Sequence, residues 1–338
     1  MAMHLSILRK GALGVVPFAF AVLSSEAHAD EGGASIYLLG SGAPNAAVLP
    51  PLQGVYLDNS IYIYDGHVGG EKNFILNGKV VADVDGTIAA DFVTLLWVPS
   101  TNLAGGTLAV GAALPFGAVA VDARAVVTGP LGRSLDVSKH DSTLVVGDPI
   151  ATASLGWKFG KTHVTASTMV NVPVGNYNAG ALADLAFHRW AIDASLAGSW
   201  HDEAAGWDIS GKAGITFNGR NHATDYDSGN DLHIELSAEK TFTRQFAAGL
   251  FGYQFVQISG DSGPGAKLGP FKGQVTGLGG TMAYNTIMGR SPATFRLRVA
   301  QEFWNENRLK GTAVMVSFSL PLSMKMPPQM PSRATAGP

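Results

Sequence analysis

Apolar and polar residues alternate along most of this chain with the period of two that is typical of β-strands. Between Trp207 and Phe217 the odd positions are apolar or glycine, whereas the even positions include Asp208 and Lys212. Residues 190–200 repeat this pattern, again with an aromatic residue at each end. Each stretch therefore predicts a strand with a polar face and an apolar face that aromatic side chains bracket.

The predicted strands favour a membrane protein because of their length. They have about 10–12 residues, as a tilted membrane-crossing strand requires, whereas strands of soluble proteins usually have about five or six. A soluble sandwich also alternates, but aromatic brackets are typical of barrels in the outer membrane. About 14 strands, in a range of 12–16, are expected on this basis. They lie near residues 56–66, 74–84, 87–98, 106–115, 118–128, 147–158, 161–173, 190–201, 206–217, 230–242, 246–258, 271–285, 292–304 and 310–322.

The predicted connections alternate between short and long. Tight turns are expected at Asp85-Gly86, Phe116-Gly117, Phe159-Gly160, 202–205, 243–245 and 286–291. Longer loops are expected at 67–73, 99–105, 129–146, 174–189, 218–229, 259–270 and 305–309. Outer-membrane barrels combine short periplasmic turns with longer outer loops. The fold class predicted is therefore all-β: a single antiparallel transmembrane β-barrel over residues 55–322, with both ends in the periplasm.

Both ends of the chain lie outside this pattern. Residues 1–29 predict a cleaved signal peptide, because a basic pair and an apolar stretch precede the cleavage signal Ala27-His28-Ala29. Residues 30–54 are rich in Gly, Ala and Pro and are expected to be a periplasmic lead or a segment that folds into the lumen. Residues 323–338, with four prolines, predict a disordered tail.

Composition restricts the class of protein further. The chain has no cysteine, so an exported protein of this size needs another source of rigidity, which the closed hydrogen-bond network of a barrel provides. Charged residues make up 14% of the chain and the net charge is −3, which offers no basic surface for nucleic acid. The expected partners are therefore outer-membrane lipid and small-molecule solutes.

Catalytic residue types occur without the spacing that catalysis needs. The types of a lipid hydrolase are supplied by His163 with Ser167 and by His188 near Asp184 and Asp193. No G-x-S-x-G elbow accompanies them. The segment 225–231 resembles a calcium loop, but its glycine is one place early and Leu236 stands where the loop needs a glutamate. We expect no enzyme, no metal site and no cofactor.

Ionisable residues on the polar faces are the candidates for a pore lining, because charges at membrane depth must face water, protein or each other. They are Lys79, Asp83, Asp122, Arg124, Lys158, His163, Asp193, Asp208, Lys212, His233, Glu235, Lys272, Arg296, Arg298 and Glu302. Both signs of charge occur, so the lining predicts no strong ion selectivity. Trp190, Trp200, Trp207 and Phe217 are expected at the two membrane interfaces.

A series of short motifs resembles the meta-pathway phenol-degradation family of outer-membrane β-barrels, which includes sphingosine-induced porin-like members. In chain order they are Gly32-Gly33, Tyr37-Leu38-Leu39-Gly40, Leu49-Pro50-Pro51, Gly54-Val55-Tyr56, Arg189-Trp190-Ala191-Ile192-Asp193, Thr216-Phe217-Asn218, Thr224-Asp225-Tyr226, Ser228-Gly229, Gly252-Tyr253, Gln257, Asp261, Glu302, Asn305-Glu306-Asn307-Arg308 and Gly311. The resemblance spans the mature chain and departs from the family in a shorter region between 129–146 and 174–189. It implies an outer-membrane transporter for aromatic or lipid-like compounds, without catalytic residues.

The function expected is that of an outer-membrane channel for passive or facilitated uptake of small hydrophobic or aromatic compounds. Barrels near eight strands fill with side chains, whereas 16 strands leave an aqueous channel, so about 14 strands predict a narrow pore. The substrate class follows from the family resemblance alone. The alternative is a structural or adhesive barrel that acts through its outer loops and transports nothing.

Overall fold

The computed structural model describes residues 31–33, 35–76, 79–128, 134–179, 181–270 and 272–325. The predicted signal peptide and residues 326–338 of the predicted tail lie outside them. The elements are η1 (Glu31–Gly33), β1 (Gly54–Leu76), β2 (Lys79–Leu103), β3 (Gly106–Thr128), β4 (Ser134–Val146), β5 (Ile150–Phe159), β6 (Thr162–Asn171), β7 (Ala191–Asp202), β8 (Trp207–Asn218), β9 (Arg220–Asn221), β10 (Tyr226–Asp227), β11 (Asp231–Thr241), β12 (Phe246–Gln257), β13 (Gln274–Met288), β14 (Ser291–Glu306) and β15 (Lys310–Met324). No helix in the described part of the chain is long and apolar enough to cross a membrane.

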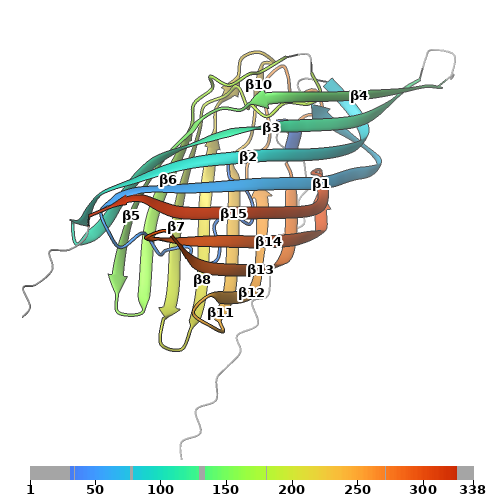
Figure 1. Ribbon diagram of the computed structural model, residues 1–338. Coiled ribbons are helices and arrows are strands. Elements are labelled where there is room, and N and C mark those ends of the chain that lie inside the picture. The colour runs from blue at the N-terminus through green and yellow to red at the C-terminus, as the bar shows by residue number, and fades with distance from the viewer. Residues whose placement is uncertain are drawn as a thin grey trace, which may run out of the picture.

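Twelve of the described strands close into one antiparallel barrel (Figure 1). Each pairs with the next in the order β1, β2, β3, β5, β6, β7, β8, β11, β12, β13, β14 and β15, and β15 pairs back with β1. Residues 107–113 of β3 pair with β5. Residues 116–128, the distal half of β3, pair with β4. Because the number of barrel strands is even, β1 begins and β15 ends at the same mouth. Most of the tight turns lie at this mouth, which is therefore the periplasmic one.

The predicted barrel is confirmed, and its strand number differs because of one region. Five strands were expected between residues 56 and 128, but the structure forms three long ones, β1 to β3. The expected tight turn at Phe116-Gly117 is wrong, because both residues lie within β3. A Cβ on Gly117 would stand 2.2 Å from the Ala89 carbonyl oxygen, so this glycine permits a close approach of two strands. Asp85-Gly86 likewise lies within β2, not in a turn, and the expected loop 67–73 lies within β1.

The strands present their apolar faces outward. Leu196 is 65% exposed and Ile209 is 52% exposed, whereas Asp193 and Asp208 on the opposite faces of the same strands are buried. In a soluble protein this arrangement would leave large apolar side chains in water. A bilayer covers them instead, so the alternation is that of a membrane barrel.

The distal ends of β1 to β4 reverse this arrangement. On β3, Val119 and Val121 are buried, whereas the Asp122 carboxylate is 62% exposed and lies 2.8 Å from His140 on β4. The expectation that Asp122 lines the lumen is therefore wrong. β3 has 23 residues, about twice the length that a membrane strand needs. Its distal half extends beyond the membrane, where water takes the outer face and the apolar side chains turn inward.

Candidate functional site in the barrel lumen

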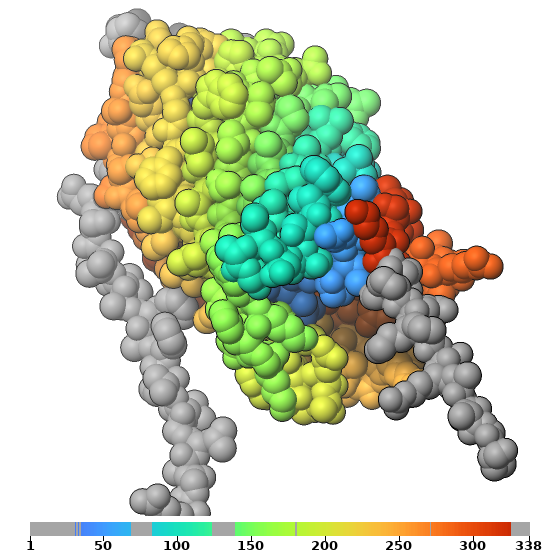
Figure 2. Space-filling model, turned by 90° about the vertical axis from the view of Figure 1, so that its left-hand side faces the viewer, coloured from blue at the N-terminus to red at the C-terminus, as the bar shows by residue number. Residues whose placement is uncertain are grey.

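Residues 35–53, called the N-terminal segment below, run through the lumen and contact its polar wall. The Gly40 and Gly42 amides donate to the two carboxylate oxygens of Glu235, at 2.6 and 2.9 Å. Glu235 is fully buried on the inward face of β11. In the space-filling view, blue atoms from the start of the chain are set inside a rim built by later strands (Figure 2). A buried carboxylate thus holds this segment by two charge-assisted hydrogen bonds.

Further contacts fix the segment along its length. The Asn45 amide donates to Asp208 at 3.0 Å, and the Ala47 amide donates to Ser199 at 3.0 Å. From the opposite wall, the Arg298 Nε donates to the Ala43 carbonyl at 3.0 Å. The contacts come from strands on both sides of the barrel, so the segment spans the lumen.

Tyr37 places the aromatic part of the segment against the wall. Its ring stacks on His233 with 3.5 Å between ring centroids, and the Lys212 ammonium lies 4.8 Å from its centre. A Cβ on Gly42 would stand 2.2 Å from the Tyr37 hydroxyl, so a larger residue here would displace the tyrosine side chain. The Tyr37 and Gly40 motif residues therefore serve the packing of the N-terminal segment.

The buried His233 belongs to a structural network. Its Nε2 lies 2.8 Å from the Asp193 carboxylate, which also accepts from Thr216 at 2.9 Å and from Ser195. The Asp193 carboxylate and the Ser195 hydroxyl therefore both contact Nε2 of His233, at 2.8 and 3.5 Å. A catalytic triad needs them on opposite nitrogens. This geometry orients side chains and leaves no activated nucleophile.

Two cavities lie in the lumen, one on each side of the N-terminal segment. The inner cavity, toward the periplasmic mouth, has about 840 Å³ and a mixed polar lining. The outer cavity has about 210 Å³ and is lined largely by apolar and aromatic side chains. Tyr37, Leu38 and Phe92 border both of them. These three side chains therefore form the partition of the lumen.

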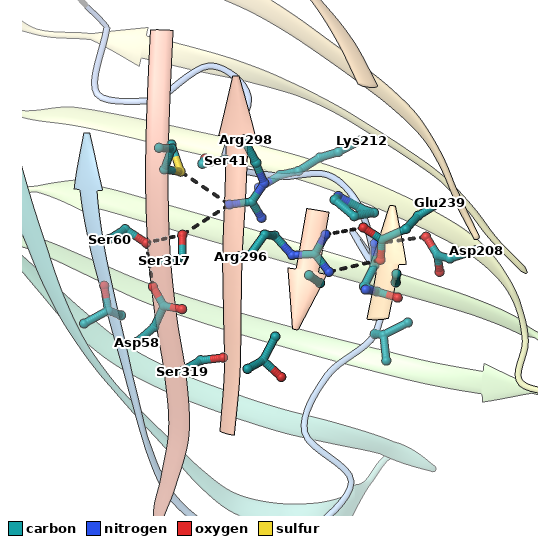
Figure 3. A pocket seen from close by; sticks show the side chains of 18 of the residues that line it. Ser41, Asp58, Ser60, Asp208, Lys212, Glu239, Arg296, Arg298, Ser317 and Ser319 are labelled. Atoms are coloured by element: carbon teal, nitrogen blue, oxygen red, sulfur yellow. Dashed lines mark hydrogen bonds and ion pairs between the residues drawn. The ribbon is translucent and has the colours of Figure 1, made fainter. Parts of the chain in front are cut away.

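The inner cavity carries the arginines of β14, which extend side by side in Figure 3. Arg296 forms a two-pronged ion pair with Glu239 of β11, with 3.1 Å between Nη2 and Oε1. Arg298 donates to Ser317 at 3.3 Å besides holding Ala43. Asp58, Asp202 and Asp208 add negative charge to the same cavity. The wall of the inner cavity therefore carries both positive and negative charges and can bind water and polar solutes.

The outer cavity lies between the inner faces of β1 to β3 and the loop 172–190. Leu182 and Ala183 of this loop are buried against Val84, Val119 and Val121. Deeper in the same loop, Tyr177 stacks on His188 with 4.6 Å between ring centroids. Burial raises the pKa of Tyr177 to about 12, so its hydroxyl stays protonated.

Asp148 anchors the loop 172–190 and was not found from the sequence. It is buried at the junction of β4 and β5. Its carboxylate accepts from the Gly175, Phe187 and His188 amides at 2.8 to 3.0 Å and from the Asn171 side chain at 2.9 Å. One side chain thus fixes the loop that covers the outer cavity.

The predicted lining residues fall into several groups. Those buried on the inner face are His163, Asp193, Asp208, His233, Glu235 and Glu302, while Lys212, Arg296 and Arg298 are partly buried there. Lys158 is exposed at the periplasmic rim and lies 3.7 Å from Glu203. Lys272 lies in the loop before β13, and Asp83 lies at an irregularity of β2. The side chains of Lys79 and Arg124 lie outside the described residues.

The remaining candidates are also placed. Trp190, Trp200, Trp207 and Phe217 are 40–57% exposed on the outer surface. Trp200 and Trp207 lie near the periplasmic turn between β7 and β8, and Trp190 and Phe217 lie at the opposite end of these strands. Arg220 lies 3.0 Å from Asp225, in the segment that resembles a calcium loop. In the described part of the chain, no three acidic, histidine or cysteine residues are arranged to hold a metal.

Comparison with known proteins places this chain in a family. The family described as “Putative MetA-pathway of phenol degradation” matches residues 71–318. The COG4313 outer membrane channel from Pseudomonas putida F1 is 17% identical over 82% of this chain and 98% of that chain, with a TM-score of 0.62. A Pseudomonas aeruginosa FadL homologue is 12% identical over 83% and 94% of the two chains, with a TM-score of 0.38. No curated protein matches this chain.

Fold, outward apolar faces and polar interior define a transmembrane β-barrel of the bacterial outer membrane. The family match covers well over half of the chain. The protein therefore belongs to the MetA-pathway phenol-degradation family, as the sequence motifs indicate.

Proposed function

We propose that this barrel is an outer-membrane channel for the passive or facilitated uptake of small hydrophobic or aromatic compounds. The observation that carries the proposal is the pair of cavities in the lumen, one on each side of the N-terminal segment, with Tyr37, Leu38 and Phe92 bordering both. A solute that enters from outside meets an apolar cavity first and a polar one second. This order suits a molecule that must leave water, cross a barrier and return to water.

The chemistry of the outer cavity supports an apolar solute. Ile88, Val121, Leu185 and Leu309 line it, and such walls favour apolar ligands through the hydrophobic effect. The family to which the chain belongs carries phenol degradation in its description, and the Pseudomonas putida neighbour is described as a channel. The family description agrees with an aromatic solute, and the neighbour's description agrees with a channel.

Passage requires the N-terminal segment to move. It is held by hydrogen bonds to Glu235, Asp208 and Ser199, each of which water can replace. The segment contributes no strand to the barrel, so its displacement leaves the wall hydrogen bonds intact. We infer that the channel opens by a shift of this segment within a rigid barrel.

Uptake into proteoliposomes tests the proposal. Vesicles that contain the purified barrel and an enclosed toluene-oxidising enzyme are expected to consume external toluene faster than vesicles that contain the enzyme alone. Because toluene crosses bare lipid, lipopolysaccharide-containing outer leaflets are used to slow the background. Equal rates of toluene consumption with and without the barrel would contradict the channel and leave a structural or adhesive role.

A further inference from the structure

Arg308 of the Asn305-Glu306-Asn307-Arg308 motif borders the outer cavity and has one buried guanidinium nitrogen without a hydrogen-bond partner. Its Nη1 is buried and has no hydrogen-bond partner among the described residues. Its guanidinium carbon lies over the Phe255 ring, 4.1 Å from the ring centre. No described carboxylate lies within 4.0 Å of it, since no ion pair involves Arg308. A buried cationic donor without a partner is costly, so this position favours an acceptor from outside the chain.

Glu302, an acid that borders the same cavity, has its own donors. Glu302 accepts from the Tyr64 hydroxyl at 2.7 Å, from the Tyr253 hydroxyl at 3.2 Å and from the Gly311 amide at 2.9 Å. It is therefore committed to the barrel wall. Tyr62, which also borders the outer cavity, has a hydroxyl with no partner among the described residues. The cavity thus offers two hydrogen-bond donors, Arg308 and Tyr62, that the chain does not use.

The size of the cavity limits the ligand. It holds about 210 Å³, and an apolar cavity of about 150 Å³ in another protein binds benzene. Val84, Val119 and Val121 form one side of it, and Leu309 lies beside Arg308 in the chain. One aromatic ring with one small substituent therefore fits, and a long acyl chain does not.

We propose that the outer cavity is a binding site for single-ring aromatic carboxylates. The carboxylate accepts from Arg308 and Tyr62, and the ring lies against the apolar wall that Leu309 forms with the valines of β2 and β3. A planar guanidinium pairs with a carboxylate through two parallel hydrogen bonds. The site rests on the proposed function only in that the outer cavity lies on the path of the solute.

Equilibrium dialysis with radiolabelled benzoate and the full-length barrel in detergent micelles tests this site. Arg308→Gln is expected to weaken benzoate binding by about tenfold to a hundredfold, the usual effect of losing a hydrogen bond to a charged group. Arg244→Gln, in an exposed periplasmic turn, is the matched control and is expected to bind benzoate as the wild type does. Tyr62→Phe is expected to weaken binding severalfold and serves if the Arg308 variant does not fold.

Benzyl alcohol separates charge recognition from apolar burial, because it has the same ring and no charge. The wild type is expected to bind it at least tenfold more weakly than benzoate, and Arg308→Gln is expected to leave this weaker binding unchanged. Equal affinity of the wild type for the two probes, or unchanged benzoate binding in Arg308→Gln, would overturn the proposal.

The outcome is distinguishable from that of the proposed function. If toluene crosses the vesicle membrane but benzoate binding does not depend on Arg308, the carboxylate site is wrong and the channel stands. If benzoate binds through Arg308 while no solute crosses, the site stands and the channel is wrong.

Discussion

Replacing Glu235 with alanine is expected to raise the conductance and solute permeability of the barrel by about a hundredfold at low solute concentration. The carboxylate accepts the Gly40 and Gly42 amides, and each bond to a charged group contributes about 1.5 kcal/mol or more. Loss of both shifts the balance between the lodged and displaced N-terminal segment by about 3 kcal/mol, or two powers of ten. Single-channel recording in planar bilayers measures the open fraction directly.

The matched control is Asp85→Ala, which removes an exposed carboxylate that pairs with His67 on the outer face of β2 and borders neither cavity of the lumen. It is expected to conduct as the wild type does. If Glu235→Ala stays closed although its heat-resistant migration on gels shows a folded barrel, the segment is held by other contacts and the account of opening is wrong.

Replacing Asp148 with alanine is expected to lower the free energy of unfolding from lipid vesicles by about 3 kcal/mol or more. The substitution leaves four donors without their acceptor at a buried site: the amides of Gly175, Phe187 and His188 and the side chain of Asn171. Urea titration followed by tryptophan fluorescence measures the loss. Proteolysis within residues 172–190 is expected to accelerate as well.

Asp225→Asn provides the comparison for this variant, since asparagine tolerates the positive φ of this position. Asp225 lies in another outer loop and pairs with Arg220 at an exposed site, so its loss is expected to cost about 1 kcal/mol or less. A similar small loss for Asp148→Ala would show that the loop 172–190 is held by its apolar residues and not by the buried carboxylate.

Alternation of apolar and polar residues was sufficient to predict the barrel from the sequence. The reason is that lipid requires an apolar side chain at every membrane-facing position. The rule is local, so the paired faces of β7 and β8 were predicted residue by residue. It fails beyond the membrane, where Val121 turns inward and Asp122 turns outward. Apolar and polar residues still alternate there, but the apolar face points inward and the polar face points outward. The sequence pattern alone therefore does not show where the membrane ends.

The contacts within the lumen were harder to predict than its polarity. Glu235, His233 and Arg298 were expected on the inner wall from their alternating positions. Each of them also contacts residues 35–53, which carry no period, and the Gly40–Glu235 pair is separated by 195 positions in the chain. The role of Asp148 was not predicted for the same reason, since three of its four donors are backbone amides of the loop 172–190, which has no alternation of apolar and polar residues.

The route of the solute through the outer cavity is tested most directly by filling that cavity. Val121→Trp places an indole in the cavity from the inner face of β3, whereas Ala120→Trp places the same group on the outer face one residue away. Toluene uptake by proteoliposomes is expected to fall to background with Val121→Trp and to match the wild type with Ala120→Trp. Equal uptake by the two folded variants would contradict passage through the lumen.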